Sequence, residues 1–127
     1  MTDTKQQVER RKHKRFPVTK DTFVGLQPDY FQVGQTLNIS VGGMAFTYMV
    51  NGKPPMQSSI LNIFSADRTF HLRDVPFRII SDIARDGIPF SALMMRECTV
   101  QFEDLTFHQK NELEYFIQNQ TKGEEKV

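Results

Sequence analysis

Turn-forming residues divide the middle of the chain into short apolar segments, and this feature restricts the fold more than any other. Breaks occur at Pro28-Asp29, between Asn38 and Gly43, at Asn51-Gly52 and at Asp86-Gly87. Between two of these breaks, Met44–Val50 alternates, with its even-numbered residues on one face, which is the period of a half-buried strand. Many short strands with regular turns favour a sandwich or a barrel.

The same reasoning predicts a set of strands along the rest of the chain. Phe70–Leu72 and Phe77–Ile83 form either one long strand or two, with Pro76 at a bend or an edge. We interpret Met94-Met95 and the many phenylalanines as core. The other expected strands are Thr22–Leu26, Phe31–Leu37, Met44–Val50, Ser59–Phe64 and Leu93–Phe102.

A helix is expected after the last strand. Thr106 and Gln109 have the spacing of a capping box, in which each side chain bonds the other residue's backbone N–H. Leu113, Phe116 and Ile117 then form an apolar stripe on one helical face. The pattern predicts a helix over about Phe107–Asn119 that docks on the β structure.

Length and charge limit the classes of function. The 127 residues suit one domain. Residues 1–20 carry seven basic and two acidic side chains, a charge of +5, so the other 107 residues must sum to −4 to give the chain's +1. A basic arm on a mildly acidic body suggests that the arm meets an anion. No apolar run reaches the ~20 residues that cross a membrane, and we expect a cytoplasmic protein without membrane insertion.

Metal and acid–base chemistry find little support in the sequence. Cys98 is the single cysteine, and we expect it to be a small buried apolar residue rather than a nucleophile. The histidines lack metal-ligand spacing, so we predict no metal site and no cofactor. The carboxylate pairs Asp82/Asp86 and Glu103/Asp104 are interpreted as turn or surface residues.

Two motifs carry the functional hypothesis. The first is Arg-x-x-x-Arg, formed by Arg11 and Arg15 and preceded by Arg10. The second is Asn-x-Ser-x-x-Gly, formed by Asn38, Ser40 and Gly43, and 22 residues separate it from Arg15. In this order, with a closing strand and helix, they resemble the signature of the PilZ family over about residues 9–118. Aspartate commonly stands at the position of Asn38 in that signature, and asparagine is tolerated.

The resemblance implies a mainly β protein, a six-stranded antiparallel barrel with a C-terminal α-helix and a flexible basic N-terminal arm. It divides the chain into a disordered tail (1–8), a domain over 9–120 (arm 9–16, barrel 17–104, helix 106–119) and a second disordered tail (121–127). It also implies a bacterial, non-catalytic receptor whose ligand is cyclic di-GMP, bound by Arg10, Arg11, Arg15, Asn38, Ser40 and Gly43.

The chemistry of these residues agrees with that ligand. Arginine offers a planar fork of donors that grips phosphate and also pairs with the O6/N7 edge of guanine. Asn38 and Ser40 can bond a guanine edge or a backbone amide. Gly43 allows close approach of ligand or backbone, or supplies a positive φ. We expect the arm to fold across the barrel when the ligand neutralises its charges.

The sequence also allows other interpretations of the two motifs and of the protein's function. The second motif could be a turn with a bulge and no ligand role. The protein could be a ligand-independent interaction module of the same fold, or a nucleic-acid-binding barrel, which the net acidic body disfavours. The sequence does not identify the downstream protein partner, the number of bound ligands, the roles of Lys12, His13 and Lys14, or whether the chain forms a dimer.

Overall fold

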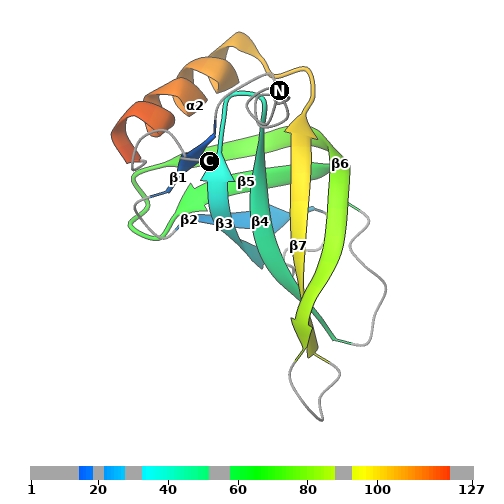
Figure 1. Cartoon of the computed structure of the whole chain (residues 1–127). Helices are drawn as coiled ribbons and strands as arrows, with labels where there is room; N and C mark the ends of the chain where they lie inside the picture. The colour runs from blue at the N-terminus through cyan, green and yellow to red at the C-terminus, as the bar shows by residue number, and fades with distance from the viewer. Residues whose placement is uncertain (1–14, 19–21, 28–32, 52–57, 88–92, 121–127) are drawn as a thin grey trace, which may run out of the picture.

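The fold is described from a computed structural model of the chain (Figure 1). The structure describes residues 15–18, 22–27, 33–51, 58–87 and 93–120. The predicted tails, 1–8 and 121–127, and most of the basic arm lie outside these residues. Within these described residues the structure has seven strands and one helix: β1 (Phe16–Pro17), β2 (Thr22–Leu26), β3 (Val33–Ile39), β4 (Gly43–Asn51), β5 (Ile60–Ser65), β6 (His71–Gly87), β7 (Leu93–Phe102) and α2 (Phe107–Gln120).

The strands form a closed antiparallel barrel, as expected. Neighbouring strands follow the order β3-β2-β5-β6-β7-β4, and a further pairing between β4 and β3 closes the ring. The short strand β1 adds to β3 where β3 has passed beyond β2. In Figure 1, α2 lies at one end of the barrel, and the far ends of β6 and β7 extend away from it. The prediction of a six-stranded barrel with a C-terminal helix is therefore confirmed.

Strand boundaries agree with the sequence where alternation is clean and differ where proline intervenes. β2 and β7 match the predicted ranges. Pro76 does not divide β6, a single strand of 17 residues in which Pro76 pairs with Ile60. Phe16, the last residue of the expected arm, belongs to β1 and packs against the core.

The barrel interior is filled by the alternating side chains that the sequence places on one face of each strand. Met44, Phe46 and Tyr48 of β4 are all at most 3% exposed. The interpretation of Met94-Met95 as core is wrong for Met95, which is 39% exposed, because adjacent residues of a strand point to opposite faces. Phe107 is also exposed.

The helix covers one end of this core. The ring of Phe116 stacks on Phe70 with centroids 4.3 Å apart, and Leu113 is fully buried. The capping box is confirmed: the backbone N–H of Thr106 donates to Gln109 Oε1 at 2.9 Å, and the N–H of Gln109 donates to Thr106 Oγ1 at 3.0 Å. Gln109 Nε2 also donates to the Arg73 carbonyl at the start of β6, which fixes the helix to the barrel. Of the helices described, none has the length and apolar character to cross a membrane.

Candidate functional site

The second motif forms the tight connection between β3 and β4. Ser40 is 3% exposed, and its Oγ accepts hydrogen bonds from the backbone N–H groups of Gly42 and Gly43, each at 3.1 Å. The N–H of Ser40 donates to the Gly43 carbonyl at 2.8 Å. The hydroxyl therefore takes the place of a backbone acceptor and holds the turn. Of the two roles considered for Ser40, the structure shows the bond to backbone amides.

The close approach of β7 leaves no room for a side chain at position 43, so this position requires glycine. A Cβ at this position would lie 2.2 Å from the Val100 carbonyl oxygen and 3.3 Å from Gln101 Cα, both backbone atoms. The Phe102 N–H also donates to the Gly42 carbonyl at 2.9 Å, which holds β7 against the turn. The φ angle of Gly43 lies outside the left-handed region, so a positive φ is not the reason for glycine here.

Asn38 lies in β3 just before the turn and is half-buried. It is the register partner of Pro17 on β1 and of Ala45 on β4. A β-bulge precedes it, where the register with β4 shifts between Thr36 and Asn38. Bulges redirect the side chains beside them, and this one sets where Asn38 stands at the entrance to the turn.

Strand β1 connects the basic arm to this turn. Phe16 is the partner of Ile39 and Pro17 of Asn38, in antiparallel register. Continued by one residue, the register brings Arg15 level with Ser40, and Arg15 is half-buried. The structure thus places four of the six predicted site residues, Arg15, Asn38, Ser40 and Gly43, in one corner of the barrel. Arg10 and Arg11 lie outside the described residues.

Comparison with known proteins identifies the family. The sequence model of a family described as "PilZ domain" matches residues 9–119. The chain belongs to the PilZ domain family. A similar solved structure is "PilZ domain with c-di-GMP of YcgR from Escherichia coli", with a TM-score of 0.62 and 14% sequence identity over 88% of this chain and 92% of that one. No curated protein sequence matches significantly.

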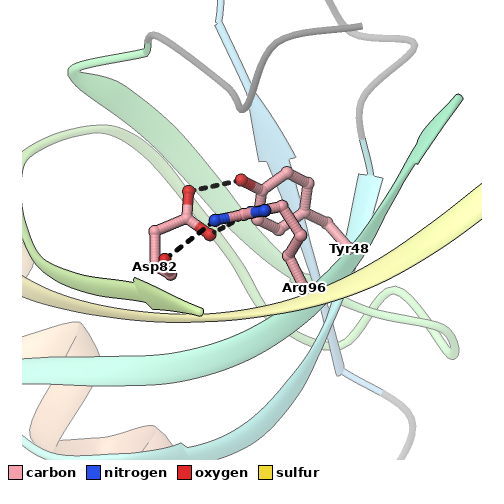
Figure 2. A network of polar contacts seen from close by, with 3 residues as sticks. All are labelled: Tyr48, Asp82 and Arg96. Carbon is pink, nitrogen blue, oxygen red and sulfur yellow. Dashed lines mark hydrogen bonds and ion pairs between the residues drawn. The ribbon is translucent and has the colours of Figure 1, made fainter. Parts of the chain in front are cut away.

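This PilZ domain also contains a partly buried polar network that the sequence did not reveal. Arg96 Nε donates to Asp82 Oδ1 at 2.7 Å, Arg96 Nη2 donates to the Asp82 carbonyl at 2.9 Å, and the Tyr48 hydroxyl donates to Asp82 Oδ2 (Figure 2). The side chains of Arg96 and Asp82 are only 19% and 13% exposed. The interpretation of Asp82 as a turn or surface residue is wrong, because it lies inside a strand and faces Arg96.

The charges of this network shift the pKa of Arg96, which belongs to it, and of the nearby Cys98. The hydrogen bond to Asp82 raises the pKa of Arg96, so the guanidinium remains charged. Burial raises the pKa of Cys98 to about 12, with the charge of Asp82 adding to the shift and that of Arg96 opposing it. Cys98 is fully buried, which confirms its interpretation as a small buried residue, and a raised pKa favours the neutral thiol.

The network and the turn are separate parts of the PilZ domain. Tyr48 pairs with Arg96 across β4 and β7, whereas Gly43 pairs with Gln101. Five residues along a strand correspond to about 17 Å. We therefore assign the network a structural role, in which partly buried, opposite charges that bond each other connect β4, β6 and β7. Within the described ranges, no three His, Cys, Asp or Glu side chains gather in a way that could hold a metal ion.

Proposed function

We propose that this PilZ domain is a non-catalytic bacterial receptor for cyclic di-GMP, bound by Arg10, Arg11 and Arg15 of the arm and by the turn from Asn38 to Gly43. The observation that carries the proposal is the pairing of β1 with β3. It joins the end of one motif to the start of the other, although 22 residues separate them in sequence. The structural similarity to a PilZ domain with c-di-GMP supports the same ligand.

The two parts of the proposed site have different tasks. The arginines supply charge-assisted hydrogen bonds to the two phosphodiesters and flat faces for stacking on guanine. The turn contributes shape, because the Ser40 hydroxyl is bonded to backbone amides and Gly43 is packed against β7. Among the turn residues, Asn38 is the one whose side chain we assign to the ligand.

We further propose that ligand binding changes the position of the arm and so presents a new surface to a downstream protein. Motility, exopolysaccharide production or biofilm control is the process we expect such a receptor to regulate, from the cytoplasm. Hydrogen exchange in residues 5–18, measured with and without saturating cyclic di-GMP, tests the change of the arm. Unchanged exchange would contradict it.

Calorimetric titration with cyclic di-GMP tests the receptor proposal itself. The wild-type protein is expected to bind saturably, GTP to give no heat, and Arg15→Ala to lose binding. Arg85→Ala is the matched control, because Arg85 is an arginine of β6 that pairs with Glu97 at 3.1 Å and lies outside the motifs. The stoichiometry also decides between one bound ligand and two. Wild-type protein that shows neither heat nor a thermal shift at high micromolar ligand rules the proposal out.

One observation favours the second candidate, a ligand-independent interaction module. Met49 and Met95 are direct partners on β4 and β7, and each is about 40% exposed (41% and 39%). Ile83 on β6 is 48% exposed. Exposed apolar side chains on adjacent strands are a feature of protein-binding surfaces. This candidate predicts that partner binding is the same with and without cyclic di-GMP.

A further inference from the structure

The turn lies beside a row of exposed polar side chains that neither motif includes. On β7, Gln101 is the register partner of Gly43 on one side and of Arg78 on the other. Direct partners in antiparallel strands project from the same face of a sheet. Adjacent strands are about 4.8 Å apart, so Arg78 begins about 10 Å across the surface from Gly43. Ser40 and Gly43 are buried, and the exposed groups nearest to the turn in this direction are Gln101 and Arg78.

Arg78 is oriented but has most of its hydrogen-bonding capacity left for another molecule. Its Nη2 donates to Gln101 Oε1 at 3.0 Å, and its Nε lies 4.0 Å from Glu103 Oε2. The side chain of Arg78 is 61% exposed and that of Glu103 is 48% exposed. An ion pair this long and this exposed contributes little, so a ligand can displace it at little cost. A guanidinium has five N–H donors, and these two contacts leave donors for a ligand.

The groups in this cluster are complementary to guanine. Arg78 and the amide of Gln101 offer donors, which suit the O6 and N7 acceptors of guanine. Glu103 offers a carboxylate acceptor, which suits the N–H groups on the same base. Adenine has an amino group, a donor, where guanine has O6, so the amino N–H would face the N–H donors of Arg78. Ile80, at the bulge that follows Arg78, is 55% exposed and gives the cluster an apolar border.

We propose that Arg78, positioned by Gln101 and with Glu103 beside it, contacts one guanine base of the ligand and selects guanine over adenine. The inference rests on the proposed receptor function and extends its site from the β3–β4 turn across β7 to β6. In this proposal the arginines of the arm bind the phosphates of the ligand, and the side chains on the barrel surface recognise one of its two bases.

The test is titration of the full chain with cyclic di-GMP and with cyclic di-AMP. Arg78→Ala is expected to weaken cyclic di-GMP binding roughly tenfold, as for the loss of one good base contact, and to change cyclic di-AMP binding by less than twofold. Arg78→Lys is expected to behave like Arg78→Ala, because lysine keeps the charge but loses the planar fork. Arg85→Ala, on the same strand, is the control and is expected to match the wild type.

The outcomes separate this inference from the receptor function. Wild type that binds while Arg78→Ala stays within twofold of Arg85→Ala overturns the role of Arg78 and leaves the receptor intact. Full recovery in Arg78→Lys also overturns it, because charge alone would then suffice. Absence of binding by the wild type overturns both. Thermal unfolding of each variant is expected to match the wild type, since the exposed Arg78 side chain holds no part of the core.

Discussion

Gly43→Ala tests whether the glycine of the second motif serves the barrel or the ligand. The new methyl carbon would lie 2.2 Å from the Val100 carbonyl oxygen and 3.2 Å from its carbonyl carbon. Both are backbone atoms of β7, so no side chain can rotate away to make room. The turn and β7 must instead separate by about 1 Å to reach ordinary contact distance.

The expected cost follows from what that movement breaks. Overpacking of this kind costs about 1–3 kcal/mol. The Phe102 N–H···O=C Gly42 bond of 2.9 Å joins the two segments that must separate, and the loss of one such bond costs about 1 kcal/mol. We expect the free energy of unfolding to fall by about 2–4 kcal/mol. For a domain of this size, that lowers Tm by roughly 8–16 °C.

Urea and thermal unfolding followed by circular dichroism measure this change. Gly25→Ala is the matched control, because the Cβ there would meet only Phe64 Cε1, at an ordinary 3.6 Å. That substitution is expected to change the free energy of unfolding by less than about 1 kcal/mol. If Gly43→Ala is as stable as Gly25→Ala, the close approach of β7 is not what requires glycine. A stable Gly43→Ala that no longer binds cyclic di-GMP would assign the glycine to the ligand.

Substitutions at three further positions test other parts of the structure. Ser40→Ala removes an acceptor from two backbone amides, and a loss of about 1–3 kcal/mol in urea unfolding, without ligand, is expected. Thr106→Ala is expected to cost about 1 kcal/mol, with Thr106→Ser as the rescue, since it retains the capping hydroxyl. Because folding raises the pKa of Cys98 from 9.0 to about 12, the unfolded chain loses this proton first as pH rises. The stability of the wild type should therefore fall relative to Cys98→Ala by about 1.4 kcal/mol per pH unit between those values, and equal slopes would contradict the shift.

Local patterns predicted the elements well because their causes lie within a few residues. β7 begins and ends where alternation predicts, and the capping box places the start of α2. The motif spacing also indicated which parts of the chain meet. The sequence did not decide whether Ser40 and Gly43 contact the ligand or the protein backbone. In the structure, Ser40 bonds backbone amides and Gly43 packs against the backbone of β7.

Non-local register explains what the sequence did not reveal. Asp82 reaches Arg96 because two bulges in β6 shift its pairing with β7, and bulges leave no clear mark in the sequence. The exposure of Met95 likewise depends on which face β7 turns inward, and a one-residue shift would reverse it. β1 has only two residues, one of them a proline, and pairing with β3 is what makes it a strand.

The pairing of β1 with β3 has a consequence for affinity that no single contact describes. It fixes the point where the arm leaves the barrel, and Arg15 is the residue immediately before that point. In the proposed site, the arm that binds the ligand is therefore attached to the barrel right beside the turn that also holds the ligand. The affinity then depends on the effective concentration of each arginine side chain at the bound ligand, and the few residues between β1 and that arginine set this concentration. Loosening β1 from Asn38 and Ile39 would lower the affinity while every binding residue remained in the sequence.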